Sequence, residues 1–89
     1  MSLPLKVLLV EDNPDDAKMV LRELNRSGFD AILERVETEA AFLGSLDDKV
    51  DLILSDYAMP QFDGMHALEL LKKSGFEIPF IRFIREVCI

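Results

Sequence analysis

The stretch Leu5-Lys-Val-Leu-Leu-Val-Glu-Asp-Asn-Pro14 passes from a short apolar run directly into a polar turn. An apolar run of this length, ended by turn residues, is typical of a strand that is buried on both faces of a parallel sheet. Asp12 or Asn13 can cap a following helix, and Pro14 suits the first helical position. The stretch therefore predicts a strand over Leu5–Val10 and a helix that begins soon after it.

The next thirty residues continue this pattern. Apolar side chains recur at three- and four-residue spacing between Pro14 and Arg26, which indicates an amphipathic helix, and Gly28 ends it. Weak alternation over Asp30–Val36 predicts a second strand. The expected inward-facing side chains are Ala17, Val20, Leu21 and Leu24 of the helix and Ala31, Leu33 and Val36 of the strand.

The second half of the chain shows the same alternation. Thr38 opens a second helix that reaches Leu46, and the apolar run Val50–Leu54 predicts a third strand that ends in Ser55-Asp56. Breaker residues make Tyr57–Gly64 a loop. We expect a third helix with Met65, Leu68, Leu70 and Leu71 on its apolar side, closed by Ser74-Gly75, and a fourth strand over Ile78–Ile84.

The resulting order, β-α-β-α-β-α-β with short connections, predicts an α/β fold. Such an alternation gives an open parallel sheet flanked by helices, with right-handed crossovers. Eighty-nine residues allow one small domain, and no internal repeat or linker divides the chain.

Composition narrows the functions that this domain can have. A net charge of −7 argues against a surface for nucleic acid or anionic membranes. No apolar stretch approaches the ~20 residues that span a bilayer, and the first five residues do not resemble a signal peptide. A single cysteine, Cys88, excludes an internal disulfide and fits a reducing compartment. We therefore expect a cytoplasmic protein that binds no nucleic acid and no membrane.

Acidic residues follow two of the predicted strands. Glu11 and Asp12 come after the first strand, and Asp56 ends the third. If the strand order is 2-1-3-4, these two strands are neighbours, and ligands in open parallel sheets bind where the strand order reverses. Three converging carboxylates repel one another, and oxygen ligands are what Mg²⁺ prefers. A carboxylate can also act as a nucleophile toward phosphorus. Alternatively, acidic residues merely end strands in wet loops and cap a helix.

The same residues resemble a known family. Lys6-Val-Leu-Leu-Val-Glu-Asp-Asn-Pro14, Asp51-Leu-Ile-Leu-Ser-Asp-Tyr-Ala-Met-Pro60 and Asp63-Gly64 are similar to the receiver domain of bacterial two-component response regulators. The resemblance runs from about Lys6 to Phe80 and is closest to receivers that are attached to sensor kinases or work beside them. It covers nearly the whole chain.

The resemblance implies a flavodoxin-like fold and a role in a phosphorelay. Asp56 would be the phosphoacceptor, and a histidine kinase or phosphotransfer protein would be the partner. Mg²⁺ would be bound directly by Asp12 and Asp56, with Glu11 assisting through water and the backbone carbonyl of Ala58 completing the site. The chain would then be no enzyme beyond its own phosphoryl transfer and dephosphorylation.

The sequence also departs from the family pattern. Receivers have a fifth strand and two further helices, a Ser or Thr at the end of strand four and a Lys at the end of strand five. No hydroxyl residue follows Ser74 and no lysine follows Lys73. We therefore expect an incomplete receiver-like domain over residues 1–81, an atypical tail over residues 82–89, and impaired switching. An altered or out-of-frame ending is a further hypothesis, and Arg82 or Arg85 can replace the missing charge.

Two other readings remain open at this point. In the first, the domain is a non-phosphorylated interaction module that assembles through the exposed edge of strand four, as a homodimer or by strand exchange. In the second, it is an aspartyl-phosphate hydrolase of the dehalogenase type. That class places a second Asp two residues beyond the nucleophile, where this chain has Ala58. The second reading therefore ranks lower.

Overall fold

The chain forms a four-stranded parallel sheet in the computed structural model, which describes residues 3–56 and 64–83. The strands are β1 (Leu3–Val10), β2 (Phe29–Val36), β3 (Leu52–Asp56) and β4 (Phe80–Phe83). They lie in the order β2-β1-β3-β4, and each neighbouring pair is parallel. The expected 2-1-3-4 order of a flavodoxin-like sheet is confirmed.

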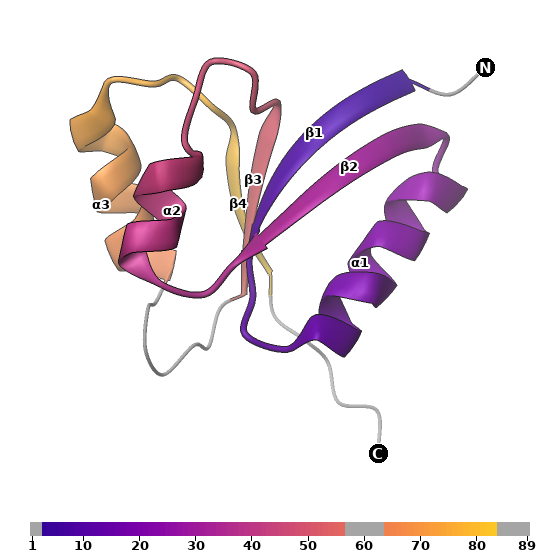
Figure 1. Cartoon of the computed structure of the whole chain (residues 1–89). Coiled ribbons are helices and arrows are strands. Elements are labelled where there is room, and N and C mark those ends of the chain that lie inside the picture. The colour runs from indigo at the N-terminus through magenta and orange to yellow at the C-terminus, as the bar shows by residue number, and fades with distance from the viewer. Residues whose placement is uncertain (1–2, 57–63, 84–89) are drawn as a thin grey trace.

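Helices cover both faces of this sheet. The helices are α1 (Pro14–Arg26), α2 (Glu39–Ser45) and α3 (Gly64–Ser74). Figure 1 shows α1 on one face and α2 and α3 together on the other. No helix in the described ranges is both long and apolar enough to cross a membrane.

The strand β1 lies at the centre and forms the middle of the core. Val7, Leu8, Leu9 and Val10 are at most 1% exposed, because strands flank β1 on both sides and helices cover its two faces. A strand buried on both faces needs apolar side chains at every position, which explains the unbroken run. The strand starts two residues earlier than expected, at Leu3.

The larger part of the core lies between the sheet and the pair α2 and α3. Phe42 of α2 is fully buried there, together with Ala67 and Leu71 of α3. The prediction that Met65 belongs to this apolar side was wrong, because Met65 is 52% exposed. Two residues correspond to about 200° around a helix, so a face that buries Ala67 turns Met65 toward solvent.

Local signals explain where the helices begin and end. The Asn13 side chain accepts a hydrogen bond from the Asp15 N–H at 2.9 Å, so Asn13 rather than Asp12 caps α1. Thr38 caps α2 in the same way, through the Ala41 N–H at 3.1 Å. Gly28 follows α1 with φ of 97°, a conformation that glycine adopts without strain, and its carbonyl accepts from the Leu3 N–H.

Asp51 fixes how β3 lies beside β1. The Lys6 N–H donates to the Asp51 carboxylate, and the Asp51 N–H donates to the Lys6 carbonyl, both at 2.8 Å. This double contact lies one residue before the paired stretch of the two strands, in which Val7 lies opposite Leu52 and Val10 opposite Ser55. Because a one-residue slip would exchange the two faces of β3, the contact also determines where the strand ends.

The connection between α2 and β3 is held by Asp47. Its carboxylate accepts from the Lys49 N–H at 2.8 Å and pairs with the Lys6 ammonium at 3.5 Å. The backbone hydrogen bond from Lys49 is the main cause that lowers the pKa of Asp47, and the charge of Lys6 adds to it. The ionised form of Asp47 is thus the one that the fold favours.

The strand β4 begins at Phe80, two residues later than expected. Pro79 lacks an N–H, but its carbonyl accepts from the Ile53 N–H at 2.9 Å, so the chain already lies against β3 there. Arg82 and Phe83 continue the strand opposite Ser55 and Asp56. Ile84 lies outside the described residues, and the division into residues 1–81 and 82–89 stays a prediction.

Candidate metal centre

The carboxyl ends of β1 and β3 meet at one edge of the sheet. Val10 lies opposite Ser55, so the residues that follow them, Glu11 and Asp56, lie side by side at this edge. Oxygen atoms of Glu11, Asp12 and Asp56 all lie within 4.8 Å of one another. The predicted convergence of the three carboxylates is what the described residues show, and we call this group the acidic cluster.

Burial makes the acidic cluster different from an ordinary surface group of acids. Glu11 is fully buried and Asp56 is 2% exposed, whereas Asp12 is accessible to solvent. Three carboxylates at this separation repel one another more strongly in a buried setting than in water. A divalent cation with oxygen ligands relieves that repulsion, and Asp12 leaves a side from which an ion can enter. The donor set therefore fits Mg²⁺.

The turn after β1 holds Glu11 in place. The Glu11 N–H donates to the Val36 carbonyl at 3.0 Å, which extends the contact between β1 and β2 by one residue. The Glu11 carboxylate accepts from the Asn13 N–H at 3.1 Å. Asn13 in turn caps α1, so one short turn fixes both the start of the helix and the position of the Glu11 side chain.

Asp56 closes β3 beside a second buried polar residue. The hydroxyl of Ser55 is fully buried and donates to the Asp56 carbonyl at 3.3 Å. On the other side, Phe83 of β4 lies opposite Asp56 in the ladder. The backbone of Asp56 is thus held both by its pairing with β4 and by the Ser55 hydroxyl.

Three further residues belong to the predicted site: Arg82 and Arg85 as charges and Ala58 as a backbone ligand. Arg82 of β4 is the register partner of Ser55 and is half-buried, whereas Arg85 and Ala58 lie outside the described residues. Whether Arg82 replaces the missing lysine charge, and whether the Ala58 carbonyl completes the site, both stay predictions.

Sequence reasoning missed Arg35, at the end of β2. Its guanidinium donates to the Glu11 carbonyl at 3.3 Å and lies 3.4 Å from the Glu37 carboxylate. Nothing in the local pattern around Arg35 signals this contact, because it joins residues 24 positions apart. Only its place at the same edge of the sheet as Glu11 could have suggested it.

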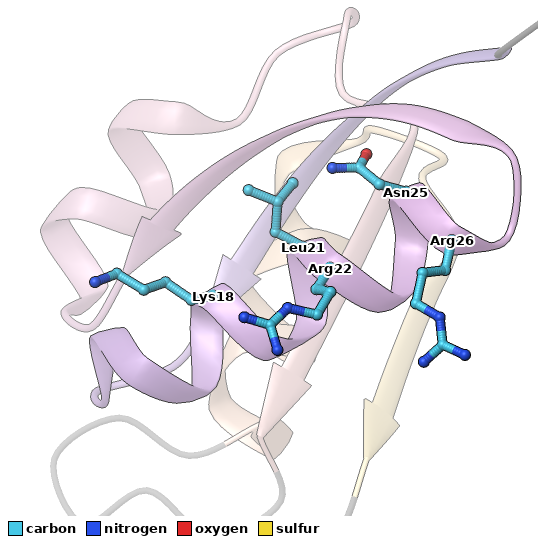
Figure 2. A pocket seen from close by; sticks show the side chains of 5 residues that line it. All are labelled: Lys18, Leu21, Arg22, Asn25 and Arg26. Carbon is cyan, nitrogen blue, oxygen red and sulfur yellow. The ribbon is translucent and has the colours of Figure 1, made fainter.

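A hollow elsewhere on the surface has the opposite chemistry. Residues of α1 line it: Lys18, Leu21, Arg22, Asn25 and Arg26. Figure 2 shows the three cationic side chains spaced along the helix, with Leu21 and Asn25 pointing up in the view and Arg22 and Arg26 pointing down. Because its charged side chains are all cations, this hollow does not suit a divalent metal ion. The acidic cluster is the better candidate.

Comparison with known proteins agrees with the fold. The family model of the response regulator receiver domain matches residues 7–84. The chain belongs to this family, the receiver domains of two-component systems.

Its relatives include proteins of several kinds. The transcriptional regulatory protein CpxR of Escherichia coli is 33% identical over 69 residues, which are 78% of this chain and 29% of that protein. RprY of Bacteroides fragilis, also a transcriptional regulatory protein, is 37% identical over 82 residues, 91% of this chain and 34% of its own. Histidine protein kinase 1 of Candida albicans is 37% identical over 73 residues, 78% of this chain and 3% of its own. The chain spans about a third of the length of the two regulators.

Proposed function

We propose that this chain accepts a phosphoryl group on Asp56 in a two-component phosphorelay. The observation that carries the proposal is the acidic cluster, in which Glu11 and Asp56 are buried within 4.8 Å of each other and of Asp12. Two direct ligands of Mg²⁺ at ~2.1 Å are at most ~4.2 Å apart. The proposed division, with Asp12 and Asp56 as direct ligands and Glu11 acting through water, follows the family resemblance, and the Ala58 carbonyl is the proposed backbone ligand.

The proposed step is a displacement at phosphorus. A carboxylate oxygen of Asp56 attacks the phosphorus of a phosphohistidine, the P–N bond breaks, and the imidazole leaves with the bonding electron pair and takes up a proton. The product is an acyl phosphate on Asp56. When bound, Mg²⁺ would neutralise charge on the phosphoryl oxygens. The sheet and Ser55 hold the backbone of Asp56, which restricts where its carboxylate can lie before the donor arrives.

The proposed phosphodonor is a histidine kinase or a phosphotransfer protein, and the proposed location is the cytoplasm. Family membership supports this partner, as does the similarity to a protein named a histidine kinase. The single cysteine of the sequence fits a reducing location. We also propose that output from this chain is weakened, since residues 75–89 contain no hydroxyl side chain to respond to the phosphoryl group.

The test is phosphorylation by a small acyl phosphate, which needs no cognate kinase. We expect intact mass spectrometry to show one added phosphoryl group in the presence of Mg²⁺ and none when a chelator removes the metal. Hydroxylamine should remove the added group, because it cleaves acyl phosphates. A folded chain whose mass does not change at saturating Mg²⁺ would contradict the proposal.

A second candidate function is assembly through β4. Within residues 3–56 and 64–83, β4 pairs with β3 on one side and with no strand on its other side. Ile81 of this strand is 50% exposed. An open edge with apolar side chains favours pairing with another chain.

This candidate predicts a dimer at tens of micromolar protein, measured by light scattering. Ile81→Lys should weaken the dimer by about tenfold or more, because a lysine at an edge opposes strand pairing. Ile32→Lys is the matched control and should leave the mass unchanged, because Ile32 is also exposed (65%, against 50% for Ile81) but lies on β2, at the other side of the sheet. A monomeric mass for the unchanged chain would exclude this assembly.

A further inference from the structure

The end of β2 holds the backbone of Glu11 at two points. The Val36 carbonyl accepts from the Glu11 N–H at 3.0 Å, and the Arg35 guanidinium donates to the Glu11 carbonyl at 3.3 Å. Two consecutive residues of β2 therefore bind the backbone N–H and the backbone carbonyl of Glu11. One contact is made by the main chain and the other by a side chain.

The side-chain contact occurs where the regular sheet ends. The last register pair of β1 and β2 is Val10 and Val36, after which β1 turns toward α1 and β2 toward α2. In a continuing ladder a backbone N–H of β2 would reach the Glu11 carbonyl. The chain of β2 has already turned away, so the Arg35 guanidinium makes this hydrogen bond instead.

This hydrogen bond affects Asp12 as well as Glu11. The peptide bond is planar, so the orientation of the Glu11 carbonyl also sets the direction in which the chain enters Asp12. Resting on the proposed function, we infer that Arg35 is a positioning residue for the metal site, which orients Asp12 through the Glu11–Asp12 peptide. Arg35 does not itself touch the metal in this arrangement.

The surroundings of Arg35 favour an effect of geometry over an effect of charge. The Glu37 carboxylate lies 3.4 Å from the guanidinium and compensates much of its charge, and about a third of the Arg35 side chain is exposed to solvent. Geometry matters most for Mg²⁺, which requires a nearly ideal octahedron, whereas Ca²⁺ tolerates irregular ligand positions. A lost positioning contact should therefore weaken Mg²⁺ binding more than Ca²⁺ binding.

The test is the affinity of Arg35→Met for each of the two metals, measured by calorimetry on the full chain. We expect Mg²⁺ affinity to fall by about tenfold, the lower end of the range for residues that orient metal ligands, and Ca²⁺ affinity to fall less. Arg35→Gln should act in the same direction. A readout that needs no metal is the amide resonance of Asp12, which should shift in both variants because its peptide loses a hydrogen bond.

The control is Arg22→Met, which removes the same charge from the hollow along α1. It should leave the ratio of the two affinities and the Asp12 resonance unchanged. If both affinities rise together in Arg35→Met, Arg35 acts only through its charge and the inference is overturned; unchanged affinities overturn it as well. Failure of the folded unchanged chain to bind Mg²⁺ is a different result, which overturns the proposed function and this inference together.

Discussion

Asp56→Asn should abolish phosphoryl uptake completely while leaving the fold intact. The amide has nearly the shape of the carboxylate, so the end of β3 and its packing should persist. The amide oxygen carries no negative charge, however, and is a poor nucleophile toward phosphorus. Intact mass spectrometry after treatment with Mg²⁺ and a small acyl phosphate should therefore show one added group on the unchanged chain and none on the variant.

The matched control is Asp48→Asn, an exposed aspartate outside the acidic cluster. It makes the same chemical change and should leave phosphoryl uptake as it is. Uptake that persists in Asp56→Asn would show that another residue is the acceptor. Peptide mapping of the phosphorylated chain would then identify that residue directly.

Asp12→Asn should make the chain more stable without metal and should remove most of the stabilisation by Mg²⁺. Without metal, two unit charges 4.8 Å apart repel by about 3 kcal/mol at an effective dielectric constant of 20, so removing one of three carboxylates should raise the free energy of unfolding by about 1–3 kcal/mol. With Mg²⁺ at about 100 times its Kd, the unchanged chain should gain about 2.7 kcal/mol, because the ion binds the folded state. The variant should gain much less, since it has lost a direct ligand.

Urea unfolding with a chelator and with saturating Mg²⁺ measures both free energies of unfolding. The variant is expected to be the more stable protein in the chelator and to lose that advantage in Mg²⁺. Asp48→Asn should respond to the metal as the unchanged chain does. Equal stabilisation of the unchanged chain and Asp12→Asn by Mg²⁺ would show that the ion binds elsewhere.

The elements that could be predicted from the sequence are those with strong local signals. The helix Pro14–Arg26 was predicted with its exact bounds because Asn13, Pro14 and Gly28 mark its two ends. The buried strand β1 was recognised from its unbroken apolar run. The convergence of Glu11, Asp12 and Asp56 followed from the alternation of elements and the strand order.

Features that depend on contacts between distant residues could not be predicted in this way. Met65 has the apolar character of a core residue, but the rotation of α3 about its axis is set by packing against the sheet, and Ala67 is buried instead. Arg35 looked like an ordinary strand residue, because its contact with Glu11 arises only after β1 and β2 pair. The place of Ala58 in the site stays a prediction, since that residue lies outside the described ranges.

Because the double contact between Lys6 and Asp51 anchors the start of β3, the number of residues from Asp51 to Asp56 decides where the Asp56 carboxylate lies. The contact lies at the opposite end of β3 from Asp56, about 17 Å away for five residues of extended strand. Every carboxylate of the acidic cluster would survive an added or deleted residue between Asp51 and Asp56, yet Asp56 would no longer lie level with Glu11. A related chain with an intact site should therefore have both the aspartate that corresponds to Asp56 and the same number of residues between it and the position of Asp51.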